Sequence, residues 1–118
     1  MEKELINLYR ENRPWGNFER FIKNEKCTVK ILYVNPYSKT SLQVHKKRDE
    51  FWKVLDGFAQ VELDDRILSA SIGDIIQVPK NLKHRITTES KSCVILEISL
   101  GEFNENDIVR IEDDYDRS

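Results

Sequence analysis

Short stretches rich in β-branched and aromatic residues recur along this chain, and turn-forming residues separate them. They lie at residues 15–22, 27–34, 41–45, 50–55, 58–63, 74–79, 84–88 and 92–100. The intervening segments include NPYSK, KKRD, DG and PKN, which are typical of turns. Many short strands at close spacing favour an antiparallel sandwich or a small barrel. The pattern therefore predicts an all-β fold.

The two ends of the chain differ from this pattern. Within residues 1–12, apolar residues among charged ones predict a short amphipathic helix, and Pro14 and Gly16 end it. Residues 104–118 form an acidic tail that nevertheless carries apolar side chains, so we expect the tail to dock on the barrel. Those side chains are Ile108, Val109, Ile111 and Tyr115.

Length and charge narrow the class of protein. The 118 residues predict a single domain over 1–118, and no linker or repeat divides it. A net charge of −2 argues against nucleic acid and anionic membranes as partners. The charged N-terminal region lacks the apolar run of a signal peptide, and no stretch is long enough to span a membrane. Cys27 and Cys93 form no CxxC pair, so we expect free thiols in a reducing cytoplasm.

Both histidines of the chain lie in segments that combine turn residues with metal-ligand types. Gln43 and His45 are two residues apart, so on a strand both side chains point to one face. Glu50 follows five residues after His45, and His84 closes a second segment that begins at Gly73. The four side chains Gln43, His45, Glu50 and His84 supply an amide oxygen, two imidazoles and a carboxylate. They predict a divalent metal site with positions left for water or substrate.

The first of these segments resembles the first motif of the cupin superfamily. That motif is a glycine, five residues, His-X-His, a short gap, a glutamate, six residues and a glycine. His45, Glu50 and Gly57 match it, whereas Tyr37 and Gln43 stand at the first glycine and the first histidine.

The second segment resembles the second cupin motif. Gly73, Pro79 and His84 match, with Asn81 in place of a glycine and Thr88 in place of an asparagine. The resemblance implies a cupin-type small antiparallel β-barrel, a jelly roll, with the four ligands named above.

Three blocks in order resemble type II phosphomannose isomerases, in particular the domain that often follows a mannose-1-phosphate guanylyltransferase. They are RPWGNFE from Arg13, SLQVHKKRDEFWKVLDGFAQV from Ser41 and GEFNENDIVRIEDDYDRS from Gly101. The resemblance covers residues 13–117. Because no glycine-rich nucleotide loop is present, we expect a standalone isomerase-type domain.

The resemblance implies interconversion of mannose 6-phosphate and fructose 6-phosphate, with a small sugar phosphate as the partner molecule. The reaction needs an electrophile, and a divalent metal supplies one. Zinc is our first choice of metal, although the ligand set also suits cobalt, nickel, manganese or iron.

The resemblance also suggests catalytic and phosphate-binding residues. Glu97 matches a glutamate of the family and is our candidate base, with Lys47 and Lys83 as alternatives for proton transfer. Arginine suits bidentate contact with phosphate. Four arginines lie in family-like blocks, of which Arg48, also a candidate catalytic group, and Arg110 are preferred over Arg85 and Arg13.

Three other functions stay open. The family usually has further histidines where Lys47 and Phe51 stand, and a glycine in place of Asp116. These departures favour two alternatives, a non-catalytic sugar-binding cupin and an isomerase for another sugar. An iron-dependent dioxygenase is the third, and Gln43 in place of a histidine argues mildly against it. By analogy with small cupins, we expect a homodimer.

Overall fold

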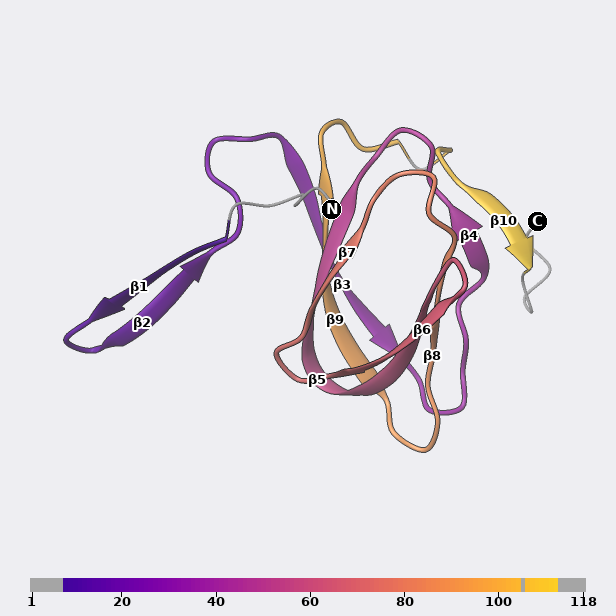
Figure 1. The fold of residues 1–118 in the computed structure, drawn as a ribbon, viewed down its shortest axis with the longest axis horizontal. Helices are drawn as coiled ribbons and strands as arrows, with labels where there is room; N and C mark the ends of the chain where they lie inside the picture. Colours follow the sequence, from indigo (N-terminus) through magenta and orange to yellow (C-terminus); the bar gives the residue numbers. More distant parts are fainter. Residues whose placement is uncertain (1–7, 105, 113–118) are drawn as a thin grey trace.

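The computed structural model describes residues 8–104 and 106–112, and within them it contains ten β-strands and no helix (Figure 1). The strands are β1 (Tyr9–Arg13), β2 (Gly16–Arg20), β3 (Cys27–Val34), β4 (Leu42–Val44), β5 (Glu50–Leu63), β6 (Arg66–Ser71), β7 (Ile75–Val78), β8 (His84–Thr87), β9 (Cys93–Leu100) and β10 (Val109–Glu112). All pairings are antiparallel, so the predicted all-β antiparallel fold is confirmed. In this part of the chain no helix is long and apolar enough to cross a membrane.

The long strand β5 holds the barrel together. Its first half pairs with β7 and β9, and its second half pairs with β6 and β8. The sheet therefore runs in the order β10-β4-β8-β5-β9-β3 and curls on itself, with β3 and β10 as its edges (Figure 1). The expected turn at Gly57 between two strands is wrong, because Gly57 lies inside the single strand β5.

Gly57 is required where β5 bends. Its φ is +80°, and a Cβ atom there would overlap the carbonyl oxygen of Ser92. We therefore expect Gly57→Ala to destabilise the fold by about 2 kcal/mol or more. That loss would lower the melting temperature by roughly 8 °C or more. Gly73→Ala is the matched control, because Gly73 has a φ of +91° but open space around it. Equal melting temperatures for the two variants would contradict this assignment.

The predicted N-terminal helix is wrong within the described residues, because Tyr9–Arg13 is strand β1. It forms a hairpin with β2 across a two-residue turn, and Tyr9 and Phe18 pack with ring centres 6.1 Å apart. Arg10 also pairs with Glu19 at 2.9 Å. These cross-strand pairs outweigh the local helical pattern. The part of the predicted helix over residues 1–7 lies outside the described residues.

The hairpin projects from the barrel (Figure 1) and is anchored at its base to β5. The ring of Phe21 stacks on that of Phe51 with centres 5.9 Å apart, and Lys53 donates to Glu19 at 2.7 Å. This contact covers one end of the outer sheet face. Farther along the same face, on the edge strand β3, Val29 and Ile31 are 55% and 45% exposed. The outer face of β3 therefore carries exposed apolar side chains.

The inner face carries polar residues in adjoining rows. Lys30, Glu97 and Trp52 are register partners across β3, β9 and β5, and the neighbouring row holds Ser99 and Glu50. Apolar rows follow, and with the opposite strands they form a core that includes Val54, Ala59, Val61, Leu63, Ile86 and Ile95. The fold thus places charged side chains inside the barrel at one end and its apolar core at the other.

The C-terminal segment lies against the barrel as far as it is described. Strand β10 pairs with β4, with Arg110 opposite Gln43. Residues 113–118 of the predicted tail lie outside the described residues. Cys27 and Cys93 are free, because they lie at opposite ends of the paired strands β3 and β9.

Candidate metal centre and cavity

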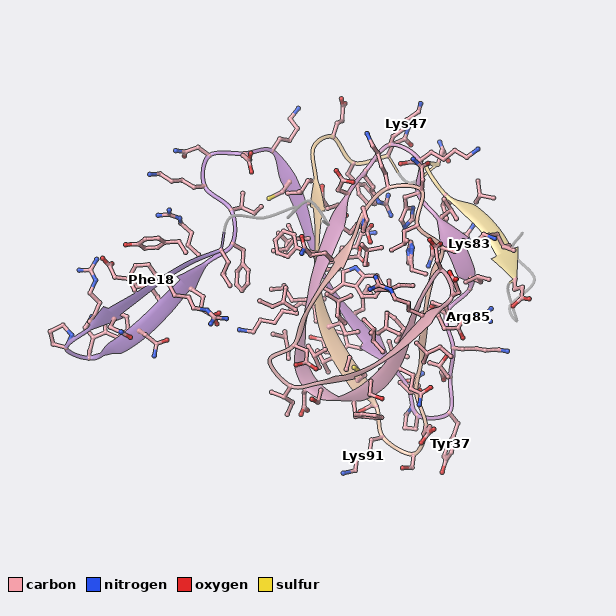
Figure 2. The ribbon with its side chains drawn as sticks, in the orientation of Figure 1. Phe18, Tyr37, Lys47, Lys83, Arg85 and Lys91 are labelled. Carbon is pink, nitrogen blue, oxygen red and sulfur yellow. The ribbon has the colours of Figure 1, made fainter. Side chains whose placement is uncertain are left out.

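A cavity of about 890 Å³ opens into the barrel and is lined from both edge strands and from the middle of the sheet. Figure 2 shows side chains reaching into the space between the curled strands. The cavity lining includes Gln43, His45 and His84, three of the four predicted metal ligands. It also includes the cationic side chains of Lys30, Lys39, Arg48 and Arg110. An anionic, polar ligand fits such a lining.

His45, Glu50 and His84 come together at the polar end of the barrel. One potential ligand atom from each lies within 4.8 Å of the others, and all three side chains are buried. Nε2 of His45 is 3.6 Å from a carboxylate oxygen of Glu50, and the two imidazole centres are 4.9 Å apart. Gln43 is the register partner of His84 on the adjacent strand. His45 and His84, which are 39 residues apart in the sequence, thus join Glu50 in one group of potential metal ligands.

Both imidazoles are held in the tautomer that a metal requires. Nδ1 of His45 lies 2.7 Å from the carbonyl oxygen of Asp107, and Nδ1 of His84 lies 3.0 Å from that of Leu82. A carbonyl only accepts, so each Nδ1 carries the proton and each Nε2 keeps its lone pair. Burial lowers the pKa of both histidines, which also favours the neutral form.

Glu50 is buried, and three donors orient its carboxylate. Nε of Arg48 donates to it at 2.7 Å, while Nε1 of Trp52 and Oγ of Ser99 each donate at 3.2 Å. Such outer contacts are typical of metal-ligating carboxylates. A set of two imidazoles, one carboxylate and one amide fits a divalent ion.

Arg48 reaches the same ligand atoms that a metal would use. Its Nη2 donates to Nε2 of His45 at 3.1 Å. A metal and the guanidinium group cannot both use that lone pair, so this contact must open when a metal binds. Opening it would leave Nη2 of Arg48 available to a ligand in the cavity.

Asp107 fastens the metal-ligand segment to the C-terminal part of the chain. Its carboxylate accepts from the backbone N–H groups of Lys46 and Lys47, next to its contact with His45. The side chain of Lys47 is exposed and does not line the cavity, and Figure 2 shows it at the rim of the barrel. Lys83 is likewise exposed. The structure therefore leaves Glu97 as the candidate base within the cavity.

Glu97 lines the cavity and is only 8% exposed. Burial and the negative charge of Glu50 raise the pKa of Glu97 to about 7. A carboxyl group that titrates near neutral pH is suited to accept and return a proton there.

The structure brings two of the four candidate phosphate-binding arginines to the cavity and places the other two elsewhere. Arg48 and Arg110 line the cavity. Arg85 is directed to Thr40 and Glu112, with its Nε donating to the Thr40 carbonyl at 2.8 Å. Arg13 lies on the projecting hairpin and pairs with Glu11 at 2.6 Å. Neither Arg85 nor Arg13 is brought to the cavity.

Several cavity residues were missed by the sequence analysis, and Lys30, Phe103 and Ser41 are the most informative of them. Lys30 is the one charged residue in the alternating segment CTVKILYV, which is the signal that could have identified it. Phe103 follows β9 and is half-buried. The hydroxyl of Ser41 is buried, and among the described residues it has no hydrogen-bond partner. A buried hydroxyl is costly without a partner, so Ser41 points to a polar ligand in the cavity.

Sequence comparison relates almost the whole chain to one family and to parts of larger proteins. The family described as Mannose-6-phosphate isomerase C-terminal matches residues 2–113. The chain is 33% identical to Xanthan biosynthesis protein XanB of Xanthomonas campestris, over 90% of this chain and 23% of that protein. It is 34% identical to Alginate biosynthesis protein AlgA of Pseudomonas aeruginosa, over 90% of this chain and 22% of that protein. The chain thus spans about a quarter of the length of these curated relatives.

Comparison with solved structures supports the fold. Oxalate decarboxylase from Bacillus subtilis superposes with a TM-score of 0.68 at 24% identity, over 74% of this chain and 24% of that one. A sugar phosphate isomerase of the cupin superfamily from Silicibacter pomeroyi superposes with a TM-score of 0.59 at 21% identity, over 64% and 51% of the two chains. These likenesses concern the fold alone. The match over residues 2–113 establishes that this chain belongs to the mannose-6-phosphate isomerase C-terminal family.

Proposed function

We propose that this protein is a metal-dependent aldose–ketose isomerase that interconverts mannose 6-phosphate and fructose 6-phosphate. The observation that carries the proposal is the His45, Glu50 and His84 group, which adjoins a cavity lined by cations and by Glu97. Membership of the family supports the same reaction class. Zinc is the metal we propose for the site.

The protein residues divide the chemistry between them. His45, Glu50, His84 and Gln43 would hold the ion, which when bound supplies an electrophile that stabilises negative charge developing on oxygen. Glu97 takes the proton from C2 of the open-chain aldose and returns it to C1, while the hydroxyl proton on O2 is transferred to O1, so that the two transfers together yield the ketose. The cations of the cavity bind the phosphate.

The two positions where the family usually has histidines bear on the binding-only alternative. Phe51 packs against Phe21 on the outer sheet face, and Lys47 is exposed. A histidine at either position of this backbone would point away from the cavity, so its replacement removes no group from the candidate site. This supports an isomerase over a non-catalytic sugar-binding cupin.

The test is conversion of mannose 6-phosphate by the purified protein, followed by NMR. We expect fructose 6-phosphate to accumulate, with solvent deuterium appearing at the exchanged carbon. Mannose without the phosphate is the matched control, and we expect its turnover to be far slower. Tight binding of mannose 6-phosphate without any turnover would instead identify a binding protein. Oxygen consumption by the iron-loaded protein would identify an oxygenase.

We also propose that two copies pair through the outer face of β3 and β9. Val29 and Ile31 are exposed there, and beside them on β9 lie their register partners, the buried Ile98 and the half-buried Leu96. Where this face reaches β5, the charge of Lys53 is neutralised by Glu19. A self-complementary contact would therefore bury apolar surface without bringing like charges together.

Ile31→Lys should convert the dimer to a monomer, because it would bury an unpaired charge at the contact. Sedimentation velocity measures the change. Ile67→Lys on β6 is the matched control, since Ile67 is 65% exposed on another strand. A wild-type protein that sediments as a monomer at micromolar concentration would refute the pairing.

A further inference from the structure

Two cations of the cavity share one aromatic ring. Nζ of Lys30 lies 4.3 Å from the ring centre of Phe103, and Cζ of Arg48 lies 4.6 Å from it. Nζ of Lys30 and Cζ of Arg48 are therefore separated by no more than the sum of these two distances. Phe103 offsets part of the cost of holding like charges close together, because its ring attracts both.

Lys30 points into the barrel from the edge strand β3. It lines the cavity, and its register partner on β9 is Glu97. Among the described residues, Lys30 makes no ion pair within 4.0 Å, in contrast to Lys53 on the outer face. The charge of Lys30 acts on the neighbouring Glu97, whose pKa it lowers against the larger effect of burial. Because no ion pair occupies this partly buried ammonium group, it is suited to bind an anionic ligand.

We propose that Lys30, oriented by Phe103, is a second cationic contact for the phosphate group of the substrate, beside Arg48. This inference rests on the proposed function for the identity of the ligand, a sugar phosphorylated at the end away from its reacting carbons. Lys30 lies outside the three sequence blocks that resemble the family, so those blocks assign it no role in ligand binding.

The placement of Arg48 relates this phosphate position to the candidate metal. The guanidinium contacts His45 and Glu50 and also lies against the ring of Phe103, which Lys30 shares. Glu97, the register partner of Lys30, lines the same cavity. The two cations, the candidate base and the candidate metal ligands therefore belong to one site.

Inorganic phosphate is the probe that tests Lys30 independently of turnover. The full chain is titrated with phosphate while ³¹P line width is measured, both loaded with zinc, which frees Nη2 of Arg48, and after treatment with a chelator, because a bound metal would itself attract phosphate. We expect Lys30→Gln to weaken phosphate binding by roughly ten- to a hundredfold, the loss of one charge-assisted contact. Lys30→Arg should retain most of the binding. Lys26→Gln is the matched control, since Lys26 is exposed and does not line the cavity.

Phe103→Leu separates orientation from charge, because it keeps apolar bulk and removes the aromatic face. We expect a smaller loss of phosphate binding than in Lys30→Gln. The proposal would be overturned if Lys30→Gln bound phosphate as tightly as Lys26→Gln while both variants melted at the wild-type temperature. Phosphate binding that depends on Lys30 would sustain it even in a protein that converts no mannose 6-phosphate, so the two proposals fail separately.

Discussion

His84→Ala is expected to abolish tight metal binding and, with it, turnover of mannose 6-phosphate. The imidazole of His84 is buried within ligand distance of His45 and Glu50, and its Nδ1 contact with Leu82 directs Nε2 toward them. Changes to outer contacts of a metal ligand already cost about 10- to 100-fold in affinity. Loss of the ligand itself should therefore exceed a hundredfold. Metal content after dialysis, measured by mass spectrometry, gives the result directly.

A control from the same strand separates metal binding from folding. Thr87→Ala alters β8 three residues away from His84 and removes no candidate ligand. It should bind metal like the wild type. If His84→Ala retained one tightly bound ion per chain, His84 would not be a ligand.

Glu97→Gln is expected to make the protein more stable and less active. The raised pKa of Glu97 means that the native state holds this proton more tightly than the unfolded chain does. Ionised Glu97 thus costs stability as the pH rises from about 4.5 through about 7. In chelator-treated protein, Glu97→Gln should gain up to about 3 kcal/mol above pH 7 and little near pH 4.5. Thermal melting between pH 4.5 and 8 measures this difference.

The same substitution removes the candidate base. Turnover by the metal-loaded variant should fall by about 10²- to 10⁴-fold, the usual contribution of a positioned proton-transfer group. Glu102→Gln is the matched control, because Glu102 is exposed just beyond the same strand and does not line the cavity. Full turnover by Glu97→Gln would remove Glu97 from the mechanism, and a stability gain independent of pH would contradict the assigned pKa.

Alternation along strands was sufficient to predict much of the candidate site. Gln43 and His45 two residues apart do line one cavity, and Glu97 lies in it as well. Period-two spacing puts Gln43 and His45 on one face of a strand, whereas Glu97 was identified through the resemblance to the family. Arg85 illustrates the same rule, because it adjoins inward-facing His84 and therefore points to the opposite face, where it pairs with Glu112.

The structural features that the sequence analysis missed depend on contacts that local sequence patterns do not contain. The hairpin at Tyr9–Arg13 depends on cross-strand contacts with β2, which an amphipathic pattern does not contain. The continuity of β5 through Gly57 depends on the backbone of Ser92, thirty-five residues later. The pairing of Lys30 with Glu97 and its contact with Phe103 likewise require the β3–β9 register.

The central claim is that one divalent ion, held at His45, Glu50 and His84, is needed for isomerisation of a sugar phosphate. The most direct measurement titrates zinc into chelator-treated protein and records both bound metal and conversion of mannose 6-phosphate at each addition. The claim predicts that turnover rises in proportion to bound metal and levels off at one ion per chain. Turnover that persists without metal, or one tightly bound ion without turnover of mannose 6-phosphate, would contradict it.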